Sequence, residues 1–485
     1  MKRRIRFLAL MILGSGLNVA CGSSGLNALP FLGGSAGPAA GHDGGTVPTI
    51  GGPGSVGEHA GFAGTLFGNE SVPRGSDNTH TAGYALMRDL GMTTIREGWN
   101  WRNIEVGKHQ YVSWMDYFDQ KAATFAQMGV KVQAMVTDTP DWASSDPAYA
   151  SKTGWDEASL GRYTVPLGLG APIFADGTDV YKPGAKPNLN NYYAAYMFDM
   201  VSRFKGKIHY WQVWNEPDFP SGDLTAGTSS NGSNRYWTGS VEDYVRLLKV
   251  SHVIVKGIDP AAKITLGGLG YEKYLAGIID RGGAAYFDVV DFHAYGSDKR
   301  TSNGVLTSDW GFLGRYRAMK QVLQAKGITG KTFGCSETGF SADNPSEQAS
   351  YVGKLFATAA AQGDIETVQW SVFANPGFNN IGLIDKATLS KKTLGYDAYK
   401  FAASQLSDAA PISEVKATGV QGYQFRRKDN KPLYVVWASD GSARLTLPLA
   451  QAQVFDKTGT KLEAKIEKGQ LALDVSTAPT FIVGS

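Results

Sequence analysis

Cysteine is almost absent from the sequence. Among 485 residues only Cys21 and Cys335 occur, and Cys21 lies close to the N-terminus behind a short apolar segment. If Cys21 is removed on export or is modified, no disulfide can form within the chain, and stability must come from a packed core. Two cysteines and seven scattered histidines also argue against a structural zinc site.

Charge is scarce as well. Charged residues make up 19% of the chain, and the formal net charge is +3. No block rich in lysine and arginine follows the N-terminal segment, so the sequence does not suggest a nucleic-acid partner. Low charge combined with 11% aromatic residues favours a globular body with clefts over disorder. The length predicts a large core with a satellite domain.

Long apolar runs are missing, and the apolar run near the N-terminus is too short to cross a membrane as a helix. Basic residues precede it and small residues follow it, which predicts a secretory signal over residues 1–21. The ending LNVAC resembles a bacterial lipoprotein signal, in which Cys21 is lipidated, although Asn18 stands where leucine is usual. The alternative is an ordinary cleaved signal. We expect an exported protein, either an outer-membrane or cell-envelope lipoprotein or a periplasmic or secreted one.

Residues 22–58 are rich in glycine, serine, alanine and proline and carry almost no charge. Such a segment cannot bury enough apolar surface to fold, so we expect a disordered tether. After a lipid anchor, a tether would let a catalytic body reach away from a membrane. The alternative is a leader without a role, which would have the same composition.

From residue 59 to 406, short β-type segments alternate with amphipathic helical stretches. This alternation predicts parallel strands joined by helical crossovers, and eight such units predict a (β/α)8 TIM barrel, an α/β fold. The alternative is a doubly wound sheet, but no GxGxxG motif follows the first strand. The expected strands are 61–67, 92–98, 130–137, 208–215, 263–268, 287–295, 331–337 and 366–373.

After the barrel, residues 407–485 change in character. Short β-rich segments are separated by turn residues, and no long helical pattern occurs. This pattern predicts a small C-terminal domain with antiparallel strands, a β-sandwich packed beside the barrel.

Two strand ends of the predicted barrel carry a glutamate. Asn215 and Glu216 end the fourth strand, and Glu337 ends the seventh. The carboxyl ends of barrel strands form the active face, and strands four and seven lie nearly opposite one another, so the two carboxylates can converge over the mouth. Two carboxylates about 5–5.5 Å apart are what retaining glycoside hydrolysis needs, with the two pKa values set apart by their surroundings.

This arrangement resembles clan A of the glycoside hydrolases, which has an Asn-Glu-Pro stretch at strand four and a second glutamate ending strand seven. The resemblance covers residues 62–406, and within the clan the nearest likeness is to family 39, in the stretches REGWNWRNIEVGKHQYVSW and MVTDTPDWAS. It implies that Glu216 is the acid/base, that Glu337 is the nucleophile, and that Asn215 binds the sugar 2-hydroxyl.

The same resemblance implies roles for four further residues. Arg96 in TTIREGW matches the arginine that hydrogen-bonds the nucleophile. His293 and Tyr295 in FHAYG match a histidine and a tyrosine beside the nucleophile, and Trp370 in VQWSVF matches the tryptophan that floors the sugar site. Aromatic rings suit this task because sugar rings present apolar C–H faces. Each of these residues also has a structural reading, as an ion-pair partner or as core packing.

Several further residues are weaker candidates for the active site. Trp142 is a predicted substrate-binding residue, and Trp99, Trp101 and Trp155 are possible sugar platforms. The carboxylates Asp138 and Asp218 lie near the expected mouth. Cys335 should point the same way as Glu337 by strand alternation, where either an inert or a reactive thiol is possible.

The sequence therefore predicts a retaining glycoside hydrolase, endo-acting on a bacterial or environmental polysaccharide. The alternatives are an exo-acting β-glycosidase such as a β-xylosidase and a non-catalytic carbohydrate-binding lipoprotein. No metal or organic cofactor is implied, because two carboxylates suffice for the bond chemistry. The expected partners are a polysaccharide or oligosaccharide substrate and, through an N-terminal lipid, a membrane; we expect a monomer.

Overall fold

A computed structural model of the chain describes most of the sequence beyond the N-terminal region. The described residues are 65–70, 81–150, 160–225, 235–296, 311–371, 373–375, 380–385, 388–389 and 393–485. The predicted signal, the tether and Cys21 lie outside them. Within these ranges, no helix has both the length and the apolar character needed to cross a membrane.

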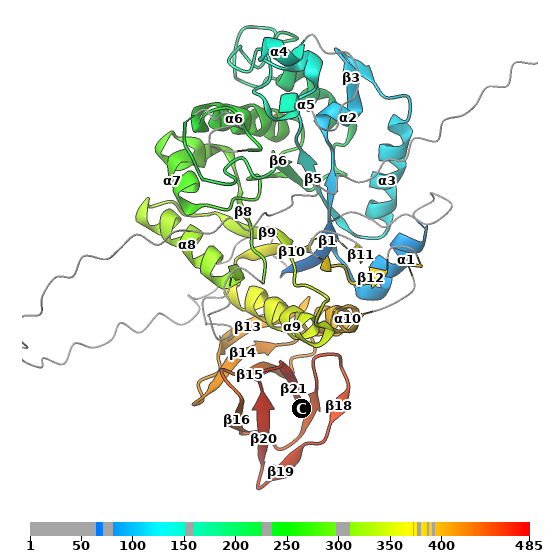
Figure 1. Cartoon of the computed structure of the whole chain (residues 1–485), viewed down its shortest axis with the longest axis vertical. Helices are drawn as coiled ribbons and strands as arrows, with labels where there is room; N and C mark the ends of the chain where they lie inside the picture. The colour runs from blue at the N-terminus through cyan, green and yellow to red at the C-terminus, as the bar shows by residue number, and fades with distance from the viewer. Residues whose placement is uncertain are drawn as a thin grey trace, which may run out of the picture.

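Eight parallel strands close into a barrel surrounded by helices (Figure 1), in the order β1-β10-β9-β8-β7-β6-β5-β2. The predicted (β/α)8 fold is confirmed, and each expected strand overlaps one that is present. The barrel strands are β1 (Leu66–Glu70), β2 (Thr94–Gly98), β5 (Lys131–Val136), β6 (Tyr210–Val213), β7 (Lys263–Thr265), β8 (Val289–His293), β9 (Thr332–Thr338) and β10 (Ile365–Trp370).

The first strand runs further along the chain than predicted, through Gly68 to Glu70. A Cβ atom at Gly68 would lie 2.0 Å from the carbonyl oxygen of Thr94, so only glycine lets β1 approach β2 this closely. Phe67 is buried and stacks on Phe356 at 4.0 Å. Glycine ordinarily weakens a strand, but Gly68 is what allows β1 to pair closely with β2 and the barrel to close.

The crossover helices begin at recognisable caps. Asn191, Asn344 and Thr393 each accept a backbone N–H of the following turn, and Ser240 with Asp243 forms a capping box. The helices are α1 (Thr81–Leu90), α2 (Trp101–Ile104), α3 (Met115–Gln127), α4 (Pro147–Ala150), α5 (Tyr192–Arg203), α6 (Val241–Ile258), α7 (Glu272–Asp280), α8 (Gly311–Ala325), α9 (Pro345–Gln362) and α10 (Leu394–Leu406).

Shorter elements decorate the loops. They are 3-10 turns at Asp141–Ala143, Leu160–Tyr163 and Gly283–Tyr286, and the strand pairs β3 (Glu105–Gly107) with β4 (Gln110–Tyr111) and β11 (Ala374–Asn375) with β12 (Ile384–Asp385).

The interior of the barrel is polar at its centre. Asp291 of β8 is fully buried; its Oδ1 accepts the backbone N–H of Ser336 at 2.9 Å, and its Oδ2 accepts the side-chain amides of Gln133 at 2.7 Å and Gln212 at 3.2 Å. Burial raises the pKa of Asp291, while the charges of His293 and Arg96 and these hydrogen bonds oppose the rise. This network fixes the Gln212 side chain and the Ser336 backbone inside the barrel.

Strand β2 is held from both sides. Arg96 points into the barrel, and the next residue, Glu97, points outward and pairs with Lys121 of α3 at 2.6 Å, with both side chains less than one tenth exposed. A buried, hydrogen-bonded pair of this kind resists movement because either charge alone would be costly. The outward pair thus fixes the strand that carries Arg96 inward.

Beyond α10 the chain forms two antiparallel sheets, with the strand orders β13-β14-β15-β21-β17-β18 and β16-β20-β19. The predicted C-terminal β-sandwich is confirmed. Its strands are β13 (Ala410–Glu414), β14 (Val420–Arg426), β15 (Pro432–Ala438), β16 (Ser442–Leu447), β17 (Ala452–Phe455), β18 (Lys461–Leu462), β19 (Lys465–Glu467), β20 (Gln470–Ser476) and β21 (Thr480–Gly484).

The sandwich packs directly on helices α9 and α10 (Figure 1). Phe401 of α10 contacts Phe455 and Phe481, with ring centroids 5.5 and 5.0 Å apart. On α9, a Cβ atom at Gly353 would lie 2.8 Å from the ring of Pro479. The apolar core therefore runs without a break from the barrel helices into the larger sheet of the sandwich.

Candidate active site

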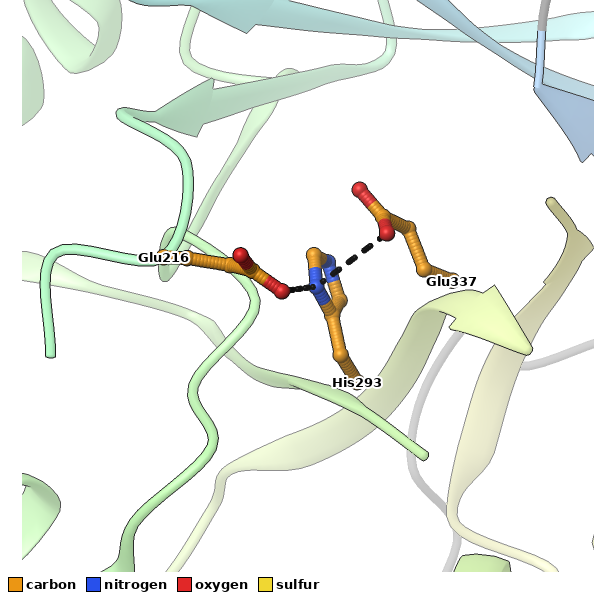
Figure 2. Close-up of side chains that lie close together, drawn as sticks. All are labelled: Glu216, His293 and Glu337. Atoms are coloured by element: carbon orange, nitrogen blue, oxygen red, sulfur yellow. Dashed lines mark hydrogen bonds and ion pairs between the residues drawn. The ribbon is translucent and has the colours of Figure 1, made fainter. Parts of the chain in front are cut away.

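The segment after β6 places Glu216 at the barrel mouth. Strand β6 ends at Val213, and the backbone then turns through left-handed conformations at Trp214 (φ 72°) and Glu216 (φ 45°). The N–H of Glu216 donates to the carbonyl of Gly267 at 2.6 Å. Non-glycine residues rarely adopt this conformation, and such strain is typical of functional positions. The turn points the carboxylate toward His293 (Figure 2).

A β-bulge places Glu337. Cys335 pairs with Phe292 of β8, but the next pair in register is His293 with Glu337, so Ser336 is an extra residue on β9. The Oγ of Ser336 lies 2.9 Å from the Gln212 amide inside the barrel. Both Ser336 and Glu337, although consecutive, therefore face the interior and the mouth.

The bulge corrects the expectation for Cys335. Strict alternation would put Cys335 and Glu337 on the same side of β9. Instead Cys335 is fully buried in the apolar core, and burial raises the pKa of its thiol. A thiol in such surroundings is inert rather than reactive.

His293, at the end of β8, lies between the two glutamates (Figure 2). Its Nδ1 is 2.8 Å from Glu216 Oε1 and 3.5 Å from Glu337 Oε2. Burial by itself would lower the pKa of His293, but the charge of Glu337 and the hydrogen bond and charge of Glu216 outweigh it and raise the pKa. The sequence predicts this histidine beside Glu337, the expected nucleophile; its shorter contact is to Glu216.

Hydrogen bonds behind His293 connect it to the buried network of the barrel. The Gln212 amide donates to Ser336 Oγ at 2.9 Å, and Ser336 Oγ is 3.0 Å from His293 Nε2. If Ser336 donates its proton to Nε2, the imidazole proton lies on Nδ1 and is donated to Glu216. The Asp291 network thus extends through Gln212 and Ser336 to the carboxylate of Glu216.

Both oxygens of Glu337 are hydrogen-bonded. Arg96 Nη1 donates to Oε1 and the Tyr295 hydroxyl donates to Oε2, each at 2.7 Å. Burial alone would raise the pKa of Glu337, but the charges of His293 and Arg96, with these hydrogen bonds, hold it below its usual value. Glu337 is therefore kept ionised, as a nucleophile must be.

Arg96 holds several groups of the site at once. Its side chain is 1% exposed, and besides Glu337 it donates to Gln212 Oε1 at 2.7 Å and to Asn215 Oδ1 at 2.6 Å. With its oxygen turned toward Arg96, Asn215 has its Nδ2 donor as the group for a ligand oxygen. One planar guanidinium thereby fixes the relative positions of three side chains at the ends of two strands, β6 and β9.

The two glutamates are more exposed than the histidine between them. Glu216 and Glu337 are 21% and 15% exposed, whereas His293 is 5% exposed. One oxygen of each glutamate and a nitrogen of His293 lie within 4.8 Å of one another. Both carboxylates are therefore partly accessible and lie a short distance apart.

Two carboxylates and a histidine at this spacing are also a set that could bind a metal ion. Here Glu337 Oε1 accepts from Arg96, Oε2 accepts from Tyr295, and Glu216 Oε1 is bound by His293. A cation at the same point would face the positive guanidinium and displace these hydrogen bonds. The arrangement suits acid–base and nucleophilic chemistry better than metal binding.

The predicted aromatic platforms are placed differently. Trp370 is fully buried, its indole N–H donates to the carbonyl of Ile381 at 2.8 Å, and it is not an open floor. Trp142 donates to the carbonyl of Glu105 and packs edge-on against Trp101. Trp99 and Trp101 are 0% and 1% exposed and belong to the core, and Trp155 lies outside the described residues.

The two further carboxylates have structural partners. Asp138 accepts the side-chain amide of Asn100 at 3.0 Å, and burial raises its pKa, opposed by the charge of Arg162. Asp218 is fully buried and turned toward the loop after β7. Burial raises the pKa of Asp218 to about 7, against the lowering effect of backbone hydrogen bonds.

Four residues near the glutamates were missed by the sequence analysis. Gln212, Asp291 and Ser336 form the supporting network, and each is a polar residue within a buried strand, which was the available signal. Tyr236 comes from the long loop after β6. Burial and the charges of Glu216 and Glu337 raise its pKa. The position of Tyr236 in the fold could not be predicted from the local sequence.

No known protein-family model and no curated protein matches this sequence. Among solved structures, it is similar to a family 39 glycoside hydrolase from the gut symbiont Bacteroides cellulosilyticus (18% identity, TM-score 0.62), covering 87% of this chain and 81% of that one.

Two other similar structures are the catalytic domain of a family 30 xylanase from Talaromyces cellulolyticus (12% identity, TM-score 0.56, 87% of this chain and 97% of that one) and a glucosidase from Croceicoccus marinus (11% identity, TM-score 0.54, 89% and 98%). The chain therefore shares its fold with glycoside hydrolases of families 39 and 30, which belong to clan A. At these identities the likeness is one of fold.

Proposed function

We propose that the protein is a retaining glycoside hydrolase in which Glu337 is the nucleophile and Glu216 the acid/base. In the first step, an oxygen of Glu337 attacks the anomeric carbon while Glu216 gives its proton to the departing glycosidic oxygen. The products are a covalent glycosyl–Glu337 ester and a free alcohol. In the second step, Glu216 takes a proton from water, and that water displaces Glu337. Two inversions give net retention.

The observation that carries this proposal is the short separation of two carboxylates with different partners. Their nearest oxygens lie within 4.8 Å, which is close to the separation of about 5–5.5 Å between the carboxyl groups of retaining enzymes. Glu337 is bound by Arg96 and Tyr295, which favour its ionised form, while Glu216 is bound by His293. Asn215 would donate its Nδ2 to a sugar hydroxyl beside the reacting carbon.

For the substrate we propose a bacterial or environmental polysaccharide cleaved internally. The long segments after β5 and β6 motivate endo action, and one similar structure is a xylanase. The similarity to a glucosidase supports an exo-acting β-glycosidase as the second candidate. A non-catalytic carbohydrate-binding protein is disfavoured because both carboxylates and their supporting hydrogen bonds are in place.

The test is to incubate the full-length protein with plant and bacterial polysaccharides and aryl glycosides, using Glu337→Gln as the matched control. We expect new reducing ends from the wild type alone, and oligosaccharides rather than monosaccharide if cleavage is internal. NMR of the first-formed product should show the anomeric configuration of the substrate. An inverted first product would refute the two roles, and monosaccharide alone would identify exo action.

We also propose that the protein is exported and anchored by a lipid on Cys21, with residues 22–58 as the tether that carries the barrel away from the membrane. The support is the sequence of the N-terminal segment. In a bacterial host, the wild type should fractionate with membranes and Cys21→Ser should not. Wild-type protein found in the soluble fraction would contradict lipid anchoring.

A further inference from the structure

Asp218 is a buried carboxylate that has no role in the proposed mechanism. It lies two residues after Glu216 and is fully buried. Its Oδ2 accepts the backbone N–H groups of Gly270 at 2.9 Å and Tyr271 at 2.7 Å, and Gly270 also reaches Oδ1 at 3.2 Å. A buried carboxylate costs free energy unless it is well hydrogen-bonded, so this one is held by the loop that follows β7.

The same two loops are joined at two further points. The Tyr271 hydroxyl donates to the carbonyl of Pro220, and the N–H of Glu216 donates to the carbonyl of Gly267 at 2.6 Å. The segment after β6 and the segment after β7 are therefore joined at Glu216 itself and at two points that follow it, Asp218 and Pro220. We call these contacts the brace. They join loops that are about fifty residues apart in the chain, and the buried Asp218 is the middle contact.

The loop after β7 also supports the hydrogen-bond partner of Glu216. Gly268 has a left-handed backbone (φ 68°), and a Cβ atom there would lie 2.0 Å from His293 Nε2. Since His293 Nδ1 is bound to Glu216, the position of this loop affects both the backbone and the side-chain contact of Glu216. A left-handed glutamate persists only where its surroundings hold it.

We propose that Asp218 is a positioning residue for the acid/base Glu216, acting through the backbone of Gly270 and Tyr271. The inference rests on the proposed function. In Asp218→Asn, the charge is lost and an NH2 group replaces one of the two oxygens that face the N–H of Gly270, 2.9 and 3.2 Å away, so we expect the loop after β7 to shift. Glu216 would remain present but would be displaced from the departing oxygen, and proton transfer would weaken.

The test uses aryl glycosides of the sugar that the wild type cleaves, with leaving groups of graded acidity. A dinitrophenolate leaves without a proton, whereas a poor leaving group needs one. For Asp218→Asn we expect kcat/KM to stay within about threefold of wild type on dinitrophenyl substrates and to fall by about 100-fold on the poorest leaving groups. A loss of equal size on all leaving groups, as a purely structural role would give, would overturn the inference.

Two controls separate the outcomes. Asp223→Asn makes the same chemical change in the same segment, where Asp223 caps Thr225, and it should behave as wild type. Tyr271→Phe removes the opposite end of the brace and should show a weaker loss with the same dependence on leaving group, which keeps the test decisive if Asp218→Asn does not fold. A wild type inactive on every glycoside would count against the proposed function, whereas an active wild type with no leaving-group dependence in either variant would count against Asp218 alone.

Discussion

Glu337→Gln is expected to lower kcat/KM by about 10⁴-fold or more, because an amide of the same shape cannot attack the anomeric carbon. The substitution keeps an oxygen that can accept from Arg96 or Tyr295, so folding should be preserved. The measurement is kcat/KM on the most reactive glycoside, with thermal unfolding as the control for structure.

Glu216→Ala and Glu337→Ala make a matched pair when azide is added. Without Glu337, azide must take the place of the nucleophile and should give a glycosyl azide of inverted configuration. Without Glu216, the glycosyl–Glu337 ester still forms from a reactive substrate, and azide should open it with net retention. The same configuration from both variants, or no azide adduct from either, would contradict the two roles.

The second large effect is expected at Arg96. Arg96→Met removes hydrogen bonds to Glu337, Asn215 and Gln212 together, and loss of a preorganised donor of this kind costs about 10²–10³ in rate. It also removes one of the charges that hold the pKa of Glu337 low. The pKa of Glu337 should therefore rise, and because the nucleophile must be ionised, the acidic limb of the kcat/KM profile should move to higher pH.

Arg96→Lys is the informative control. Lysine keeps the positive charge but not the planar fork, so the acidic limb should stay closer to that of wild type while the rate still falls. The profiles of both variants should be measured on one aryl glycoside. An acidic limb that does not move in Arg96→Met would show that Arg96 has no influence on the ionisation of Glu337.

Much of the barrel follows from local sequence. Buried strands of apolar and β-branched residues alternate with amphipathic helices whose caps are short-range features, such as Asn344 before Pro345. The ends of β6 and β9 were predictable for the same reason, since an apolar run gives way to Asn215 and Glu216 in one case and to Glu337 in the other. Polar residues where a barrel strand ends identify the active face.

The remaining features depend on contacts between distant segments. The bulge at Ser336 arises from the pairing of β9 with β8 and β10, so alternation within β9 alone gave the wrong direction for Cys335. The burial of Trp370 depends on Ile381, and that of Trp101 on its stacking with Tyr196. A tryptophan near a mouth looks the same in sequence whether it faces substrate or the core.

The contact between the sandwich and the barrel has a consequence for modularity. Helix α9 follows the strand that carries Glu337, and it lies under Pro479, while α10 meets Phe455 and Phe481 through Phe401. A chain cut at Leu406 would leave these faces open to water. The sandwich is thus part of the unit that folds around Glu337, and it is not an appendage that recombination could exchange without repacking the barrel.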